Sequence, residues 1–437
     1  MATGDRVLLT ALRLRDEDQA EADESLEELG ALIETLDGTI VGRVLQVREA
    51  PEPALCFGRG KVDELKALVP AERITVVAHD GYLTPTQNRN LEKALGLRVL
   101  DRTEVILEIF ANHARTRMSK TQVEIARLQF SLTRLARRWT HLERQRGGGV
   151  TMRGVGEKQI ELDRRSIKDR ISRLTRELED IDRVARTKRK RRAELPKVAL
   201  VGYTNVGKST LLNALTGAET LVVDKLFATL EASVKVMRYG ERPAILITDT
   251  VGFIRKLPTS LIASFRSTLD EVNEADLLLH VLDLSHPAFE RQRIDTDAVL
   301  AELGALDKPT IYVGNKVDRL GDRSVTNYLE RIYPGYVLTS SLTGEGIETL
   351  KTRIYEHFEQ RFQRERLVFS YLELGLLDEL RKVAKIERIE YEGDRVLVEV
   401  VADERVLAQV RARVGRGSAE YLPDTVLEVR EPPNDQP

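Results

Sequence analysis

Short apolar runs alternate with amphipathic stretches along the first 114 residues. The apolar runs have the length of buried strands and lie at residues 7–9, 39–47, 74–78 and 97–100. Four stretches have helical character. The first starts at residue 25, and the others cover residues 61–69, 84–95 and 103–114. Because strands that alternate with helices usually pair in parallel, residues 1–114 are predicted to form a parallel sheet covered by helices.

Two of these helices carry a signal for their first turn. Glu28 follows Ser25 at the spacing of a capping box, which predicts that the first helix starts at Ser25. Thr84, Pro85 and Gln87 supply a cap, a first-turn proline and a capping partner for another helix.

Residues 115–192 have a different apolar period, in two stripes separated by a break. The stripes are Ile125, Leu128, Leu132, Leu135, Trp139 and Leu142, then Ile160, Ile167, Ile171, Leu174, Leu178 and Ile181. They predict an antiparallel helical hairpin with arms of about 30 residues, or about 45 Å. The break at residues 144–156 contains five glycines, which predicts a non-helical tip.

Charge is distributed unevenly along the chain. The net charge is −2, yet residues 115–192 contain 24 Lys and Arg against 10 Asp and Glu, a surplus of +14. A basic hairpin with a glycine-rich tip is suited to phosphate contacts in a narrow RNA-lined space. A solvated coiled coil with a loose turn is the alternative, but a much shorter turn would reverse the chain, so the pattern favours RNA.

An apolar run at residues 198–201 leads into a glycine-rich loop and then into helical sequence, the context of a P-loop. Backbone N–H groups of such a loop and of the following helix attract phosphates. Lys208 is expected at the β- and γ-phosphates and Ser209 at Mg²⁺. The predicted nucleotide-binding residues here are Gly202, Tyr203, Thr204, Asn205, Val206, Gly207, Lys208, Ser209 and Thr210.

A second buried run ends at Asp249, whose carboxylate can hold Mg²⁺ through water, while the N–H of Gly252 can meet a γ-phosphate. Thr229 lies before it, where a threonine can order a switch segment around Mg²⁺ and the γ-phosphate. The predicted metal residues are therefore Ser209, Thr229 and Asp249. The predicted catalytic residues are Lys208, Thr229 and Gly252.

Phe253 stands where Ras-type GTPases place a water-orienting glutamine. Because phenylalanine cannot orient water through a hydrogen bond, we expect slow intrinsic hydrolysis that depends on backbone groups and a partner. Asn205 can contact a monovalent cation such as K⁺ or satisfy its own turn, and both alternatives stay open.

A third set of residues is suited to reading guanine. Asp318 can accept from the N1–H and amino group of guanine, and the Lys316 stem can lie over the ring. Asn315 can face the base or brace the P-loop. Ser340, Ser341 and Leu342 can present N–H groups to guanine O6. The segments occur in the order that a GTP-binding domain requires, at residues 196–362.

Composition sets wider limits. A chain of 437 residues with 42% hydrophobic content suggests about three domains. Cys56 is the single cysteine, which excludes an internal disulfide and suits a reducing cytoplasm. No apolar stretch approaches the roughly 20 residues of a membrane span. We expect a cytoplasmic monomer, with peripheral membrane association left open.

The tail, residues 366–431, follows a βαββαβ order that suggests a small ferredoxin-like α+β module, with its last strand near residues 426–429. It contains no cluster of catalytic residues, so we interpret it as a docking domain. The predicted fold class is α/β with several domains.

Several stretches resemble the HflX family of ribosome-associated GTPases. They read RGKVDEL, NLEKAL, LDRTEVILEIFANHARTR, GGGVTMRGVGEKQIELDRR, GYTNVGKST, FATLE and DTVGFIRKLP. The resemblance implies binding to the large ribosomal subunit and its rRNA, with the glycine-rich loop near the peptidyl-transferase centre, and a role in splitting or rescuing stalled ribosomes. Val155, Lys158 and Glu231 depart from the proline, threonine and aspartate usual in that family.

Two other functions stay open at this point. One is an ATP-dependent RNA remodeller that binds ATP through the N-terminal domain, for which residues 58–61 are a weak candidate, since a plain glycine turn fits them better. The other is a GTP-gated ribosome assembly factor, which needs the same switch and the same basic arm.

Overall fold

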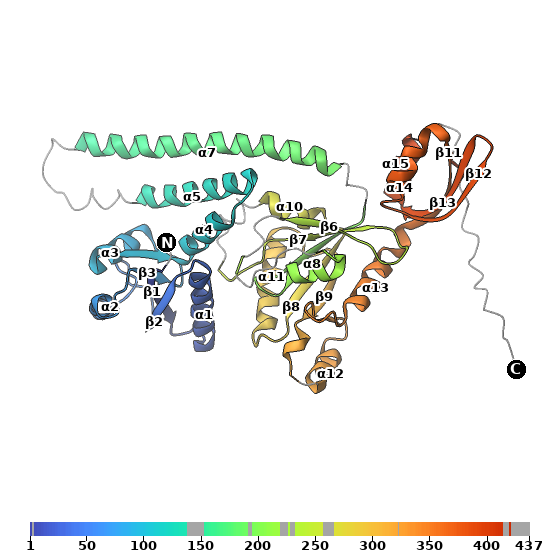
Figure 1. Ribbon diagram of the computed structural model, residues 1–437. Helices are drawn as coiled ribbons and strands as arrows, with labels where there is room; N and C mark the ends of the chain where they lie inside the picture. Colours follow the sequence, from blue (N-terminus) through green and yellow to red (C-terminus); the bar gives the residue numbers. More distant parts are fainter. Residues whose placement is uncertain are drawn as a thin grey trace.

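The molecule is elongated, with three globular parts in chain order and a long helical hairpin beside the first two (Figure 1). The computed structural model describes residues 1, 4–137, 153–190, 195–218, 226–227, 232–256, 266–321, 323–413 and 419–420.

The N-terminal part is a four-stranded sheet that is parallel, as predicted, with the strand order β2-β1-β3-β4. Its strands are β1 (Arg6–Leu14), β2 (Thr39–Arg48), β3 (Val76–His79) and β4 (Arg98–Asp101). Its helices are α1 (Gln19–Thr35), α2 (Arg59–Ala71), α3 (Pro85–Leu95) and α4 (Arg102–His113). Buried Val, Leu and Ala side chains of β1 and β3 pack against these helices and form the core.

One of the two predicted helix starts is confirmed and the other is wrong. Thr84 forms a capping box with Gln87 at the start of α3. Helix α1, however, begins at Gln19, where the Asp18 side chain accepts from the N–H of Ala20. Ser25 is buried inside that helix because the preceding residues continue it, and Ser25 and Glu28 face the next domain instead of capping a helix.

Helices α5 (Arg117–Arg137) and α7 (Arg153–Lys190) form the predicted antiparallel hairpin. Ion pairs join Arg117 to Glu177 and Glu124 to Arg170, so the two helices run in opposite directions. The arms are unequal, and the 38-residue α7 extends about 57 Å. The predicted break is too long at its C-terminal end, because residues 153–156 belong to α7. A glycine inside a helix costs only about 1 kcal/mol, which the rest of a long helix tolerates. The other tip residues, 138–152, lie outside the described part.

The middle part is a six-stranded sheet in the order β10-β9-β8-β5-β7-β6, parallel except for β6. Its strands are β5 (Lys197–Gly202), β6 (Ser233–Met237), β7 (Ile245–Asp249), β8 (Leu277–Asp283), β9 (Thr310–Asn315) and β10 (Val337–Leu338). The helices are α8 (Lys208–Thr216), α10 (Arg266–Glu274), α11 (Phe289–Glu302), α12 (Arg323–Ile332) and α13 (Ile347–Phe358). The central strands are buried on both faces, which is why they read as continuous apolar runs.

The C-terminal part is an antiparallel sheet in the order β12-β13-β11-β14. Its elements are β11 (Phe362–Ser370), α14 (Leu374–Leu380), β12 (Lys385–Glu392), β13 (Arg395–Asp403), α15 (Glu404–Arg413) and β14 (Ala419–Glu420). This is the predicted βαββαβ order. The last strand pairs at residues 419–420, and the predicted position at 426–429 lies outside the described residues.

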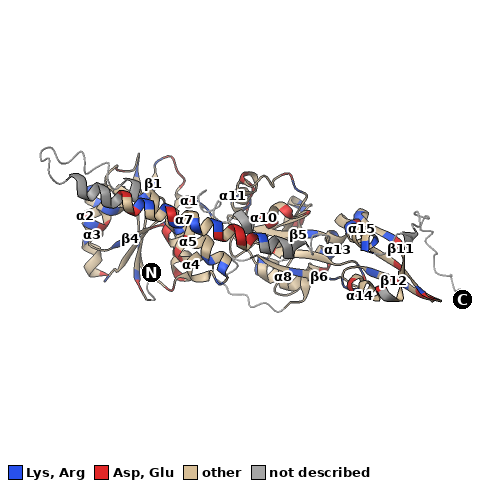
Figure 2. Ribbon diagram, turned by 90° about the horizontal axis from the view of Figure 1, so that it is seen from above, with Lys and Arg blue, Asp and Glu red and all other residues tan. Residues whose placement is uncertain are grey.

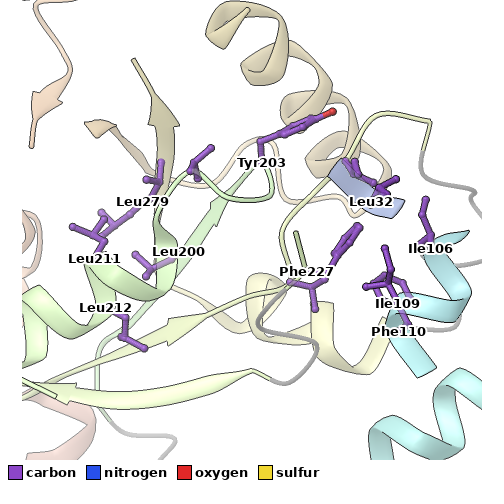
Figure 3. Packing of buried hydrophobic residues seen from close by; sticks show 14 of the residues in the cluster. Leu32, Ile106, Ile109, Phe110, Leu200, Tyr203, Leu211, Leu212, Phe227 and Leu279 are labelled. Carbon is purple, nitrogen blue, oxygen red and sulfur yellow. The ribbon is translucent and has the colours of Figure 1, made fainter. Parts of the chain in front are cut away.

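The N-terminal and middle parts share one apolar core. The ring of Phe227 packs edge-on against Phe110 of α4, with ring centroids 4.9 Å apart. Phe227 lies between the middle domain and helices α1 and α4 (Figure 3). Among the described helices, none is long and apolar enough to cross a membrane.

A buried charge network organises the N-terminal domain where it meets the middle one. Arg102 is 2% exposed and forms ion pairs with Glu28 of α1 and with Asp80, the latter at 2.7 Å. Burial acts to lower the pKa of Arg102, but Glu28 and Asp80 outweigh it and raise that pKa above its ordinary value. Each charge in this network is therefore stable only because the others are present.

Replacing Arg102 by leucine leaves the Glu28 carboxylate buried without its cation and leaves Asp80 with Lys256 alone, which we expect to cost about 3–5 kcal/mol of folding free energy. The first calorimetric transition should fall by roughly 10 °C. Arg98→Gln is the control, because it breaks only the partly exposed pair with Glu108 and should cost less than about 1 kcal/mol. Equal shifts in the two variants would show that the network does not hold the domain together.

Candidate nucleotide-binding site

The loop between β5 and α8 follows a path that requires glycine at two positions. Gly202 has φ +146°, and a Cβ there would lie 2.3 Å from the carbonyl oxygen of Val281. Gly207 has φ +95°, and its Cβ would lie 2.4 Å from Nδ2 of Asn315. Larger residues would push the loop away from strand β8 and from Asn315. The loop N–H groups and the start of α8 are thus placed to attract an anion.

Lys208, the first residue of α8, is buried below this loop. Its Nζ donates to the carbonyl oxygens of Gly202 at 3.0 Å and Tyr203 at 2.6 Å. Burial lowers the pKa of Lys208 to about 8, although the nearby Asp249 carboxylate acts in the opposite direction. A bound polyphosphate would favour the charged form, because an anion near a buried ammonium raises its pKa.

Ser209 and Asp249 meet beside the lysine. The Ser209 hydroxyl donates to Oδ2 of Asp249 at 2.6 Å, and Asp249 is buried at the end of β7. A hydroxyl and a carboxylate are oxygen donors of the kind that Mg²⁺ prefers, so this pair fits the ion.

Gly252 and Phe253 lie directly against the loop. A Cβ on Gly252 would lie 2.9 Å from Nζ of Lys208, so Gly252 is beside the lysine. The N–H of Thr204 donates to the carbonyl of Phe253 at 2.7 Å, and the N–H of Phe253 donates to Gly202 at 3.1 Å. The Phe253 ring is 2% exposed and belongs to a core cluster with Val201. The ring therefore serves the core, and only the backbone at this position faces the loop.

Residues at the end of β9 and directly after it contact the P-loop at Asn205 and Val206. Nδ2 of Asn315 donates to the carbonyl of Val206 at 2.8 Å, and its Oδ1 accepts from the N–H of Ser341 at 3.0 Å and its hydroxyl at 2.8 Å. Of the two roles considered for Asn315, the structure contains the bracing one. Nζ of Lys316 donates to the carbonyl of Asn205 at 2.7 Å.

Asp318 and the segment after β10 also lie together. Oδ1 of Asp318 accepts from the Ser340 hydroxyl at 2.6 Å, and the Leu342 side chain is largely exposed. The structure thus brings together the predicted site residues from 202–210 with Asp249, Gly252, Asn315, Lys316, Asp318, Ser340 and Ser341. Thr229 lies outside the described residues. Asn205 has φ +62°, a left-handed turn conformation that asparagine tolerates. This conformation is compatible with both roles considered for Asn205, a contact to a monovalent cation and a purely local turn.

The candidate ATP loop at residues 58–61 differs from the P-loop in what surrounds its first glycine. Gly58 is the N-cap of α2, and its N–H already donates to Oε1 of Gln46 at 3.0 Å. A Cβ on Gly58 would lie 2.5 Å from the Arg48 guanidinium, so side chains of the domain itself occupy this turn.

Comparison with known proteins agrees with this geometry. Residues 23–111 match the family described as GTP-binding GTPase N-terminal, residues 113–192 the GTP-binding GTPase Middle Region, and residues 197–316 the 50S ribosome-binding GTPase. A protein named GTPase HflX from Lacrimispora saccharolytica is 41% identical over 409 residues, covering 93% of this chain and 95% of its own. The chain belongs to the HflX family of GTPases.

A second HflX GTPase, from Flavobacterium psychrophilum, is 45% identical over 314 residues, which cover 72% of this chain and 76% of its own. Among solved structures, SsGBP in complex with GDP has 26% identity and a TM-score of 0.46, covering 82% of this chain and 99% of that one. As a member of the HflX family, the chain is a GTP-binding protein and a GTP hydrolase.

The structure adds a contact that the sequence did not predict, between the HflX-type N-terminal domain and the P-loop. The Tyr203 hydroxyl donates to Oε1 of Glu28 at 2.5 Å and accepts from the N–H of Arg255 at 2.7 Å. Burial raises the pKa of Tyr203, and the Glu28 carboxylate adds to the effect. Lys256 donates to Asp80 at 2.9 Å and to the Ser25 hydroxyl at 3.0 Å.

These contacts border a cavity of about 400 Å³ between α1, the P-loop and α11. Glu28, Tyr203, Asn205 and Lys316 all line it. The N-terminal domain therefore contacts both the P-loop and the segment that follows Gly252. The only sequence signal for this contact is the pair of basic residues after Phe253.

The buried lysine generates a pH prediction. At pH 8 about half of the Lys208 side chains of the free protein should be uncharged, and bound phosphates should restore the proton. Nucleotide binding should then take up about half a proton at pH 8 and about a tenth at pH 7, and affinity should fall as the pH rises above 8. Calorimetry in two buffers of different ionisation enthalpy measures the uptake.

Lys208→Arg provides the control, because an arginine stays charged at these pH values and should remove the uptake wherever binding survives. If wild type takes up no proton at pH 8, Lys208 is already charged and the argument fails.

Proposed function

We propose that this chain is a GTPase that binds the large ribosomal subunit and its rRNA, in the cytoplasm, and acts in splitting or rescuing stalled ribosomes. One observation carries the proposal: the P-loop region and the first helix of a long basic hairpin contribute to one shared core. The match of residues 197–316 to the family described as 50S ribosome-binding GTPase supports the choice of partner.

The hairpin supplies the RNA-binding surface. Exposed cations follow one another along α7, including Arg164, Arg165, Lys168, Arg173 and Arg176. Figure 2 shows basic and acidic residues mixed along the coloured part of α7. Since surface ion pairs are weak, a paired arginine of α7 such as Arg170 can exchange its partner Glu124 for a phosphate at little cost. The glycine-rich tip would then reach into the RNA-lined cavity.

The nucleotide site supplies the switch. We assign the phosphates to residues 202–210 and the guanine base to Asp318, with Lys316, Ser340, Ser341 and Leu342 around it. Ser209, Asp249 and Thr229 would hold Mg²⁺, which neutralises phosphate charge when bound. Lys208 and the N–H of Gly252 would stabilise charge on the γ-phosphate, and the side-chain oxygen of Asn205 would be the contact for a monovalent cation such as K⁺.

The contact between Tyr203 and Glu28 would connect these two parts. Tyr203 belongs to the P-loop, and its hydroxyl also holds the backbone of Arg255 in the segment that must move for Gly252 to meet a γ-phosphate. A change of nucleotide would therefore change the hydrogen bonds that Glu28, and through it Arg102, can make. That gives the N-terminal domain and its hairpin two arrangements, selected by GTP or GDP.

The tip can be tested without disturbing either domain. Replacing residues 147–152 by a two-residue Gly-Ser turn should leave GTP affinity near wild type, because the predicted nucleotide-binding residues belong to the middle domain and not to the hairpin. Hydrolysis stimulated by large subunits, and separation of subunits in a sucrose gradient, should fall at least about tenfold, a loss of about 1.4 kcal/mol in transition-state stabilisation.

Lys208→Ala is the control for the nucleotide site. It should remove hydrolysis, while the intact hairpin still binds RNA. Full splitting activity without the tip would mean that the glycine-rich segment only reverses the chain.

A further inference from the structure

A second charged cavity lies where the middle domain meets the C-terminal domain. The turn between β6 and β7 reaches the turn between α14 and β12 (Figure 1). The N–H of Ala244 donates to the carbonyl of Val383 at 3.1 Å, and the Arg238 guanidinium donates to the carbonyl of Lys382 at 2.8 Å. Between the two turns is a cavity of about 260 Å³, which we name the junction pocket.

An apolar cluster shared by the two domains holds the walls of the junction pocket in place. Ala244 and Leu246 share one apolar cluster with Leu377, Leu380 and Val398 of the C-terminal domain. Because the core of this cluster is buried from both sides, the two turns keep a fixed relation to each other. The pocket is therefore a fixed part of the folded structure.

The charged side chains that line the junction pocket are mostly positive. Five are cationic and one is acidic: Arg238, Arg242, Arg381, Lys382 and Lys385, with Glu241. They come from two domains, so no single helix or strand accounts for the grouping. Cations held this close repel one another, and an anion between them relieves that repulsion.

The cations are only weakly neutralised by the protein. Arg242 lies over the rings of Tyr239 and Tyr355, 5.1 and 5.2 Å from their centroids, and makes no ion pair with any residue that the structure describes. The Lys382 ammonium likewise has no carboxylate partner within the described ranges. Arg381 and Lys385 contact Asp378 at 3.6 Å and Glu387 at 3.3 Å, distances at which exposed pairs contribute little.

We propose that the junction pocket binds phosphate groups of an RNA strand. Guanidinium groups donate two parallel hydrogen bonds to phosphate, and stacking on two tyrosines fixes Arg242 in advance, so little side-chain entropy is lost on binding. The cavity is smaller than the roughly 300–1,000 Å³ of pockets for whole ligands, which suits one or two phosphates of a longer polyanion. The choice of RNA rests on the proposed ribosomal function.

The C-terminal domain then acts as a second RNA contact, at the opposite end of the molecule from the hairpin. Two separated contacts on one large RNA raise the effective concentration of each for its site. They also fix the orientation of the GTPase domain that lies between them.

The test uses the full chain and a triple substitution, Arg381→Gln, Lys382→Gln and Lys385→Gln. A control triple, Arg388→Gln, Arg395→Gln and Arg413→Gln, removes the same charge from exposed cations of the same domain that do not line the pocket. The probes are a labelled 20-nucleotide single-stranded RNA, polyglutamate and purified large ribosomal subunits, each titrated at several salt concentrations. GTP affinity and melting temperature check that both variants are folded.

We expect the pocket variant to bind the RNA at least about tenfold more weakly, with the slope of log Kd against log salt smaller by about two, for three lost contacts of about 0.7 each. The control variant should stay near wild type. Equal losses in the two variants overturn the proposal, and so does a pocket variant that loses polyglutamate but keeps RNA, which would indicate an acidic protein partner. RNA binding that depends on the pocket while large subunits are not bound at all would instead refute the ribosomal function and leave the pocket assignment standing.

Discussion

The carboxylate of Glu28 is the charge on which the arrangement of the first two domains depends. Burial raises the pKa of Glu28, while Arg102 and the Tyr203 hydroxyl act to keep the carboxylate ionised. Arg102 comes from the N-terminal domain and Tyr203 from the P-loop, so the partners of one buried group lie in two domains. An unpaired buried charge is costly, and the domains therefore cannot separate at this point without exposing or neutralising Glu28.

This constraint places the N-terminal domain against the parts of a GTPase that respond to nucleotide. Burial acts to raise the pKa of Asp80, but Arg102 and Lys256 outweigh it and hold that pKa below its ordinary value. Lys256 follows Gly252 by four positions, and Phe227 packs on Phe110 from the other side. Both segments that flank the predicted metal site thus contact the same small domain, which carries the basic hairpin.

Local features of this molecule could be predicted from its sequence because local physics determines them. The strands around the P-loop, the capping box at Thr84 and the strand–helix alternation of the N-terminal domain each depend on residues close in the chain. The P-loop glycines were predicted from their spacing, and Gly202 and Gly207 both have a positive φ.

Features that depend on distant partners could not be predicted. The pair Ser25 and Glu28 has the spacing of a helix start, but Asp18 starts the helix earlier and Glu28 contacts a residue 175 positions away. The Phe253 ring was interpreted only by its position in a motif, whereas its surroundings come from β5, α10 and α11. The junction pocket gives no sequence signal, because its cations come from turns more than 100 residues apart.

The most direct measurement is the affinity of large ribosomal subunits for Tyr203→Phe, with GDP and with a nonhydrolysable GTP analogue. The substitution removes only the hydroxyl that joins the P-loop to Glu28. A hydrogen bond to a charged group contributes about 1.5–3 kcal/mol, so the ratio of the two affinities should fall by about tenfold or more while the analogue still binds the free protein. A wild-type ratio in Tyr203→Phe would contradict the account, because the nucleotide state would then reach the hairpin by another route.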